Sequence, residues 1–176
     1  KINHQIGDIL DKEKLEDWFK SIQPQVVMHL AAQPLVLRSY KEPFLTWETN
    51  LIGTLNLLEA IRKLKSSCAI VVVTTDKVYE NHEWTYAYRE VDRLGGHDPY
   101  SSSKAAIELA VSSWRDSFFN SDSDIKVATA RAGNVIGGGD WAEDRIVPDL
   151  VRSLSMSQTV CVRNPHAVRP WQHVLE

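Results

Sequence analysis

Residues 69–73, Ala-Ile-Val-Val-Val, form an uninterrupted apolar run that is rich in β-branched side chains. Such a run is typical of a strand that is covered on both faces in a parallel sheet. The next four residues, Thr74 to Lys77, are all polar. Polar side chains at the end of a buried strand either cap a turn or face the crevice where ligands bind in open α/β sheets. The stretch therefore predicts an α/β protein and leaves open whether this strand end carries chemistry.

Helical and strand patterns alternate along the whole chain. Apolar residues at helical spacing or in short runs predict helices over 13–21, 44–64 and 100–118 and strands over 24–32, 69–73 and 125–135. Strands that alternate with helices imply a doubly wound parallel sheet. No internal repeat and no interdomain linker interrupts this pattern. Residues 80–99 form a long loop, and because loops of such length are often functional, we expect it to border a ligand.

Composition excludes several classes of protein. The net charge of -3 and the 43% hydrophobic residues fit an ordinary globular domain and give no electrostatic footprint for nucleic acid or an anionic membrane. No stretch approaches the ~20 apolar residues that span a bilayer. Cys68 and Cys161 are too few and too isolated for a disulfide framework or a zinc site, so no metal is predicted. Reduced thiols of this kind predict a cytoplasmic protein.

Three polar or glycine-rich segments follow predicted strands. They are "HLAAQP" at 29–34, "TTDK" at 74–77 and "GNVIGGGD" at 133–140. The carboxyl ends of parallel strands lie on one edge of a sheet, so we expect the three segments to converge there. Taken singly, His29 is a buried structural histidine and the glycines form a turn. Their convergence is what favours a ligand site.

Tyr100 and Lys104 open the helix predicted over 100–118. Residues four apart on a helix are neighbours, with about 5–6 Å between their Cβ atoms. An ammonium beside a phenol stabilises the phenolate and lowers its pKa from about 10, which turns the tyrosine into a general base. The alternative is a half-buried tyrosine and a surface lysine at the start of a helix.

Several motifs together resemble the extended short-chain dehydrogenase/reductase family of NAD-dependent epimerases and dehydratases. "YSSSK", "HLAA", "TNLIGT" and "TTDKVY" carry this resemblance. Within the family, "TTDKVYENHEW", "LGGHDPYSSSK", "ARAGNVIGGGDWAEDRIVPD" and "RNPHAVRPWQHVLE" resemble the branch of CDP-glucose 4,6-dehydratases. The resemblance implies a Rossmann-like fold over residues 1–176 that runs into the start of a substrate-binding region. Because the family's first strand with its Gly-rich turn and most of its C-terminal domain have no counterpart here, we expect an interior piece of a longer protein.

The resemblance also implies NAD as cofactor and assigns residues to it. Asp8 and Ile9 correspond to positions that face the adenine, and Lys104 corresponds to a lysine that binds the nicotinamide ribose. The full set of expected cofactor residues is Asp8, Ile9, Leu30, Ala31, Ala32, Gln33, Tyr100 and Lys104. Without the resemblance, Asp8 is equally a solvated capping residue and 30–33 is equally strand-end packing.

By the same resemblance, CDP-glucose is the substrate and Thr75, Asp76, Lys77, Tyr100 and Lys104 are the catalytic residues. Tyr100 and Thr75 act on the sugar 4-hydroxyl. Asp76 is the expected acid, protonated through burial, and Lys77 is the expected base, where most related dehydratases carry glutamate. Thr75, Asn134 and Arg169 contact the nucleotide sugar, and Arg163 is a weaker candidate.

Two other functions stay open on the sequence alone. A nucleotide-sugar epimerase needs the same tyrosine, lysine and NAD, but no acid and base for elimination. A noncatalytic module that cannot bind NAD is consistent with the missing Gly-rich turn. In the family, the helices that contain "NLIGTLNLLEAI" and "SKAAIELAVSSW" form a four-helix bundle between two subunits, so a homodimer is expected.

Overall fold

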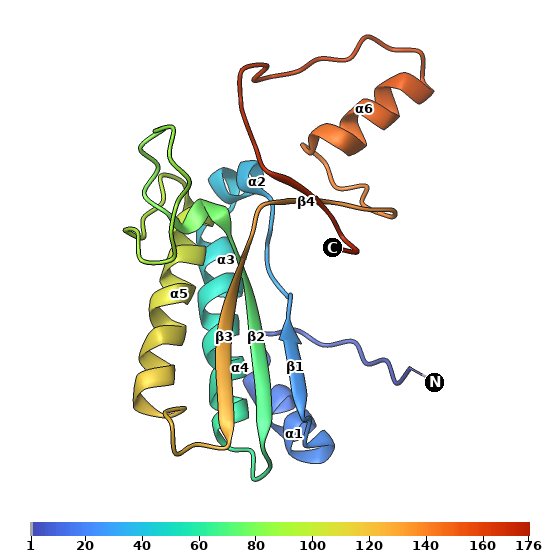
Figure 1. Ribbon diagram of the computed structural model, residues 1–176. Helices are drawn as coiled ribbons and strands as arrows, with labels where there is room; N and C mark the ends of the chain where they lie inside the picture. Colours follow the sequence, from blue (N-terminus) through green and yellow to red (C-terminus); the bar gives the residue numbers. More distant parts are fainter. Residues whose placement is uncertain (1) are drawn as a thin grey trace. The chain divides into compact units, whose positions relative to one another are not determined.

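In the computed structural model, which describes residues 2–176, the chain divides into two units, Lys1–Arg131 and Ala132–Glu176. The first unit contains a three-stranded sheet with the strand order β1-β2-β3 (Figure 1). Its strands are β1 (Val26–His29), β2 (Cys68–Thr75) and β3 (Ile125–Ala132). The parallel pairing of β1 with β2 places Val26 opposite Ala69 and His29 opposite Val72. The predicted α/β fold with a parallel sheet is confirmed.

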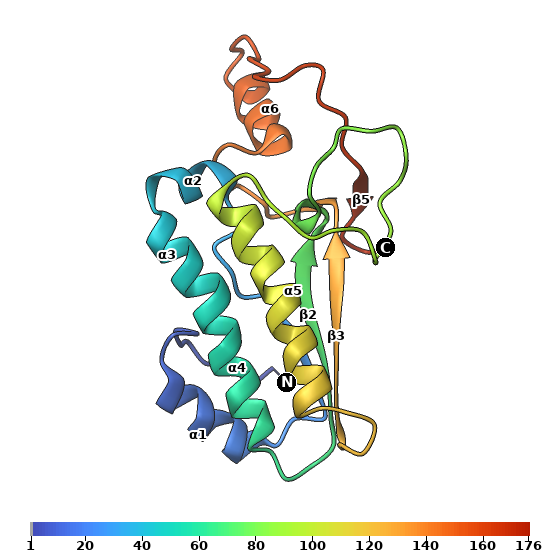
Figure 2. The ribbon, with the colours of Figure 1, turned by 90° about the vertical axis from the view of Figure 1, so that its left-hand side faces the viewer.

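Helices cover one face of this sheet, and Figure 2 shows α4 and α5 on the same side of β2 and β3. The helices of the first unit are α1 (Lys12–Ile22), α2 (Val36–Lys41), α3 (Pro43–Trp47), α4 (Gly53–Arg62) and α5 (Pro99–Ser117). The core between the helices and the sheet combines apolar side chains of α1, α4, α5, β2 and β3. Its members include Phe19, Leu58, Ile61, Ile70, Val72, Ile107, Val111 and Ile125.

The opposite face of the sheet differs from the sequence-based expectation. β2 was expected to be covered on both faces, but Ile70 and Val72 are buried whereas Ala69 is exposed. On β1, Val26 and Met28 are 61% and 62% exposed. Since successive side chains of a strand point to opposite faces, this alternation means that one face of the sheet lies in solvent in this chain. An apolar run alone does not reveal how many layers pack on it.

The predicted helix over 44–64 is not one regular helix. A π-helical segment, η1 (Glu48–Ile52), lies between α3 and α4. Such insertions are rare and frequently occur at functional sites. α4 begins at Gly53, and the missing side chain lets Ile9 pack closely against the helix, since a Cβ on Gly53 would stand 2.6 Å from Ile9 Cγ2.

The predicted strand over 125–135 is also divided. β3 ends at Ala132, and β4 (Asn134–Ile136) pairs in parallel with β5 (Trp171–His173) in a separate two-stranded sheet. Gly133 separates the two strands, and a Cβ on it would stand 2.8 Å from Pro170 Cγ. The second unit also contains α6 (Ile146–Ser155). Periodicity could not locate this boundary because both strands are apolar and only one residue separates them.

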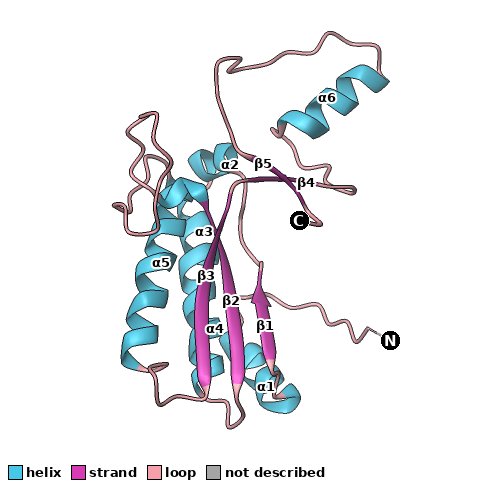
Figure 3. Cartoon of the chain, viewed as in Figure 1, coloured by secondary structure: helices cyan, strands magenta, loops and turns pink. Residues whose placement is uncertain are grey.

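The loop predicted over 80–99 is confirmed (Figure 3). It follows the short 3-10 helix η2 (Asp76–Val78) and closes on itself through an antiparallel bridge between Tyr79 and Leu94. Gly95 N donates to Val78 O at 2.7 Å, and Glu80 N donates to Arg93 O at 2.9 Å. Among residues 2–176, none of the helices combines the length and the apolar character needed to span a bilayer.

Candidate active site

The segment after β1 is tied to the π-helical segment and to α5. Leu30 and Ala31 are exposed, whereas the Gln33 side chain is buried. Gln33 N donates to Asn50 Oδ1 at 2.8 Å, and Asn50 Nδ2 donates to Gln33 O at 3.2 Å and to Ser103 Oγ at 2.9 Å. Asn50 therefore fixes the backbone that leaves β1 against α5, the helix that carries Tyr100.

The polar residues at the end of β2 form a closely spaced group. Thr75 Oγ1 donates to Asp76 Oδ1 at 3.1 Å and accepts from Lys77 N, which caps η2. Lys77 Nζ lies 3.3 Å from Asp76 Oδ1, and the two side chains are 31% and 29% exposed. The expected burial of Asp76 is therefore only partial, because η2 turns the carboxylate toward solvent and toward the neighbouring ammonium. Thr75 therefore closes the turn at the end of the strand. That this strand end faces a ligand stays a prediction.

Tyr100 and Lys104 lie one turn apart on α5, and both are buried. α5 begins where Asp98 Oδ1 accepts from Ser101 N at 2.9 Å, with Pro99 in the first turn. The loop passes close to the start of α5 at Gly96, which has no side chain: a Cβ there would stand 2.5 Å from Ser102 N. Lys104 Nζ donates to Val73 O at 3.1 Å. The predicted pair is thus anchored to β2 one residue before Thr74.

Burial sets the electrostatics of this site. Desolvation lowers the pKa of Lys104 to about 8. Desolvation, and then the charge of Lys104, lowers the pKa of His29 to about 4. His29 Nε2 and Thr54 Oγ1 are 2.9 Å apart inside the protein. His29 is therefore a neutral, hydrogen-bonded core residue at pH 7, as predicted.

A second buried network lies on the same face of α5, one turn beyond Lys104. Glu108 Oε1 accepts from Thr74 Oγ1 at 2.5 Å, and Glu108 Oε2 accepts from Thr129 Oγ1 at 2.9 Å and from Arg131 at 3.0 Å. Burial by itself raises the pKa of Glu108, but the hydrogen bonds from Arg131, Thr74 and Thr129 outweigh it and hold the pKa below its ordinary value. Hydrogen bonding to Glu108 in turn raises the pKa of Arg131.

The loop over 80–99 carries an aromatic cluster above this network. Tyr79 and Tyr88 stack with their ring centroids 4.9 Å apart, and Trp84 lies 5.3 Å from Tyr88. A pocket of about 430 Å³ is lined by Trp84, Tyr86, Ala87, Arg89 and Asp92. A role of this loop in ligand binding stays a prediction.

The expected adenine-binding residues lie before α1. Asp8 is exposed, and its Oδ1 accepts from Leu10 N at 2.9 Å. Ile9 packs against Gly53, and its carbonyl accepts from Asn56 Nδ2 at 3.2 Å. The segment is thereby fixed beside α4 with the carboxylate of Asp8 in solvent.

The expected diphosphate-binding residues belong to the second unit. Asn134 begins β4, where its backbone N donates to Pro170 O at 3.1 Å. Arg169 is exposed and donates to Val168 O at 2.7 Å. Their contact with a substrate stays a prediction.

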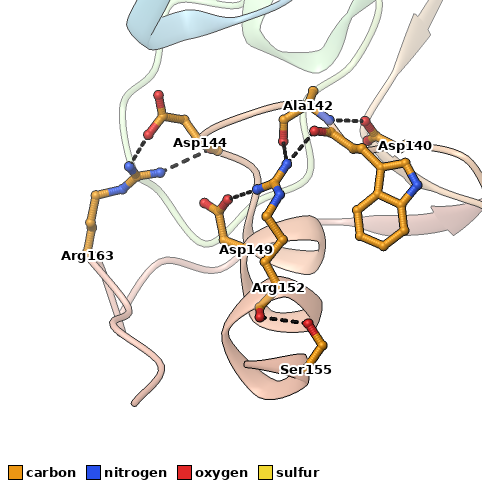
Figure 4. A network of polar contacts seen from close by, with 8 residues as sticks. Asp140, Ala142, Asp144, Asp149, Arg152, Ser155 and Arg163 are labelled. Atoms are coloured by element: carbon orange, nitrogen blue, oxygen red, sulfur yellow. Dashed lines mark hydrogen bonds and ion pairs between the residues drawn. The ribbon is translucent and has the colours of Figure 1, made fainter. Parts of the chain in front are cut away.

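Arginines order the loop between β4 and α6 (Figure 4). Arg152 donates to Asp149 Oδ1 at 2.6 Å and to the carbonyls of Trp141 and Ala142. Arg163 donates to the carboxylate and the carbonyl of Asp144. Asp140 accepts from Ala142 N and pairs with Arg145 at 3.1 Å. Asp140 and Asp144 therefore order this loop, and Arg163 has a structural partner.

Sequence reasoning did not select Asn50, Ser103, Glu108 or Arg131. The neighbours of Asn50 and Glu108 four residues along the helix are polar, with Thr46 and Thr54 beside Asn50 and Lys104 beside Glu108, so the sequence does not mark these positions as special. Arg131 is also unmarked, since arginine near the end of a strand is common on protein surfaces. In the part of the chain that the structure describes, no three histidine, cysteine, aspartate or glutamate side chains gather as metal ligands.

The sheet, the Tyr100–Lys104 pair on α5 and the polar ends of β1 and β2 define a Rossmann-fold protein of the short-chain dehydrogenase/reductase type. The family model described as GDP-mannose 4,6 dehydratase matches residues 1–176. The chain therefore belongs to that family.

Individual relatives include dehydratases and epimerases. The chain is 50% identical over 175 residues to the CDP-glucose 4,6-dehydratase of Salmonella typhimurium (strain LT2), which covers 97% of this chain and 49% of that protein. Among solved structures, a UDP-glucose 4-epimerase of Thermotoga maritima with UDP-glucose matches with a TM-score of 0.85 and 26% identity, over 96% of this chain and 54% of that one. A dTDP-glucose 4,6-dehydratase of Streptomyces venezuelae with NAD bound matches with a TM-score of 0.84 and 26% identity, over 95% of this chain and 49% of that one. The chain thus spans about half the length of these relatives.

Proposed function

We propose that this chain is part of a nucleotide-sugar 4,6-dehydratase that converts CDP-glucose to CDP-4-keto-6-deoxyglucose. The observation that carries the proposal is the position of Thr75, Asp76 and Lys77 at the end of β2, the strand to which Lys104 is hydrogen-bonded. An acid and a base beside a Tyr–Lys pair are what elimination of water requires in addition to oxidation. The identity to the Salmonella dehydratase supports CDP-glucose as the substrate.

NAD is the proposed cofactor, and when bound it accepts a hydride from C4 of the sugar and returns it to C6. The exposed backbone of 30–31, the exposed Asp8 carboxylate and the Lys104 ammonium fit an extended dinucleotide with hydroxyl groups to bind. Lys104, with its pKa lowered to about 8, is mostly charged at pH 7 and stabilises the phenolate of Tyr100. Tyr100 then takes the proton of the 4-hydroxyl, which Thr75 Oγ1 helps to orient.

Oxidation at C4 makes the C5 proton acidic because the resulting carbanion delocalises into the ketone. Lys77 takes this proton, and Asp76 protonates the leaving C6 hydroxyl. Lys77 Nζ and Asp76 Oδ1 form an ion pair at 3.3 Å in the resting structure. Elimination needs the neutral amine and the carboxylic acid, so a proton has to pass from Lys77 to Asp76 before this step.

Asn134 and Arg169 are the proposed ligands of the diphosphate, since a guanidinium binds a phosphate oxygen pair well. A homodimer is proposed through the helices that contain "NLIGTLNLLEAI" (η1 and α4) and "SKAAIELAVSSW" (α5), on which Ile52 and Leu109 are 45% and 63% exposed. Light scattering on the protein expressed from its full reading frame tests the dimer.

Incubation of that full-length protein with NAD and, in parallel, CDP-glucose, dTDP-glucose and GDP-mannose tests the reaction. The 4-keto product is scored by its absorbance in alkali. Product from CDP-glucose alone is the expected result. Lys77→Ala is expected to slow exchange of the C5 hydrogen with solvent, and unchanged exchange would remove Lys77 as the base.

An epimerase is the second candidate, supported by the fit to the Thermotoga UDP-glucose 4-epimerase. It predicts a sugar inverted at C4 that retains its C6 hydroxyl. Mass measurement separates the two, because only the dehydratase product has lost water.

A further inference from the structure

The buried pair of Glu108 and Arg131 contacts both ends of the segment that carries the proposed acid and base. Glu108 Oε1 accepts from Thr74 Oγ1 at 2.5 Å, directly before Thr75. Arg131 donates to Tyr79 Oη at 2.9 Å, directly after η2, and its guanidinium lies 5.0 Å from the centre of the Tyr79 ring. The two anchors therefore enclose Thr75, Asp76, Lys77 and Val78.

The pair itself is fixed from several sides. Glu108 and Arg131 are 3.0 Å apart, with side chains 5% and 17% exposed. Thr129 Oγ1 supplies a further hydrogen bond to Glu108 Oε2, and Arg131 also donates to Glu90 O in the long loop at 3.0 Å. A charged pair whose remaining donors and acceptors are satisfied holds its partners in one geometry. α5, β2, β3 and the loop thus meet at a single ion pair.

The anchors bear on elimination more than on the hydride step. Asp76 and Lys77 lie on η2 and contact each other, so a shift of the η2 backbone moves both side chains. Tyr100 and Lys104 lie within α5, and Lys104 has its own contact with Val73 O at 3.1 Å. The two contacts, Glu108 with Thr74 and Arg131 with Tyr79, are called the bracket below. If the bracket is loosened, Asp76 and Lys77 are expected to move, whereas Tyr100 and Lys104 are expected to keep their places in α5.

We propose that Glu108 and Arg131 are positioning residues that bracket the Asp76–Lys77 pair, through Thr74 on one side and Tyr79 on the other, for the elimination half of the reaction. This inference rests on the proposed dehydratase function. It assigns a role to Thr74 and Tyr79 as well, which contact the ion pair.

Thr74→Val in the full-length protein tests the bracket, with Thr74→Ser as the matched control. Valine keeps the shape of the buried side chain and removes the hydroxyl that Glu108 accepts, whereas serine keeps that hydroxyl. In a single turnover with CDP-glucose, the valine variant is expected to form reduced nicotinamide at a rate within about threefold of the natural protein. Its elimination, followed as C5 exchange, is expected to fall about tenfold, near the lower end of the contribution of one hydrogen bond to a charged group. Reduced nicotinamide then accumulates, and serine restores the natural behaviour.

Tyr79→Phe provides a second test that does not depend on the folding of the valine variant. It removes only the hydroxyl that accepts from Arg131, and the ring remains for stacking. The same split between a normal hydride step and slowed elimination is expected. Equal slowing of both steps, or no change in either, overturns the bracket. Failure of the proposed function is seen separately, because the natural protein with NAD bound then releases no 4-keto sugar at all.

Discussion

Each of the two units contains an ion pair between an arginine and a carboxylate, and the two pairs differ in their exposure to solvent. Arg131 and Glu108 are 17% and 5% exposed, and they bind neighbouring hydroxyls inside the first unit. Arg163 and Asp144 in the second unit are 58% and 32% exposed. A buried pair is strongly destabilised when one partner is removed, whereas an exposed pair contributes about 0–1 kcal/mol. The comparison teaches that exposure, and not the number of hydrogen bonds drawn, decides what an ion pair is worth.

The largest effect is expected from Arg131→Met. The variant leaves the Glu108 carboxylate buried without its charged partner, so the free energy of unfolding is expected to fall by about 3–5 kcal/mol. Urea unfolding measures this change. The double variant Arg131→Met/Glu108→Leu is the control, because an apolar pair removes the orphaned charge and is expected to recover most of the loss. A double variant less stable than the single one would contradict this account.

Lys104→Met is expected to stabilise the protein on the order of 3 kcal/mol at pH 7, because burial lowers the pKa of Lys104 from 10.5 to about 8. Unlike Arg131, this cation is hydrogen-bonded to a neutral carbonyl, Val73 O. The penalty is present below pH 8 and is relieved as the pH rises from 8 toward 10.5. The difference in the free energy of unfolding between the natural protein and the variant should therefore be smaller at pH 10 than at pH 7. A variant less stable at pH 7 would show that the hydrogen bond outweighs the burial of charge.

His29 is expected to have a smaller effect on stability, and at acidic pH, whereas the effect of Lys104 changes at alkaline pH. Its pKa falls from 6.5 to about 4 in the folded state, so below pH 6.5 the unfolded chain binds the proton first. Stability present above pH 6.5 is thus lost as the pH falls toward 4, and the loss at pH 5 is expected to be about 2 kcal/mol. His29→Gln should flatten this part of the profile in urea unfolding. An unchanged slope would assign it to other groups.

Arg163→Gln is expected to have the smallest effect on the free energy of unfolding, because solvent screens the contact of Arg163 with Asp144. Urea unfolding at low and high salt measures it, and the difference from the natural protein should shrink at high salt. A loss as large as that of Arg131→Met would remove the distinction between the two ion pairs.

Much of the candidate site was predictable because its signals are local. The spacing of Tyr100 and Lys104 follows from the helical period, and Thr75 to Lys77 stand at the end of β2, as an apolar run followed by polar residues predicts. The predictions failed where a local pattern has two outcomes. A continuous helical pattern over 44–64 contains the π-helical turn at Asn50, and one apolar segment over 125–135 contributes strands to two different sheets.

By itself, the sequence determined the parallel α/β class, the order of helices and strands, and the residues able to carry proton transfer, because periodicity and chemical type are properties of neighbouring residues. Only the tertiary structure decided that Asn50 joins Gln33 to Ser103 and that Arg131 meets Glu108, 23 residues away. It also decided that β2 is covered on one face in this chain. These contacts join residues distant in sequence, and their partners are selected by the packing of whole elements, which no short stretch of sequence encodes.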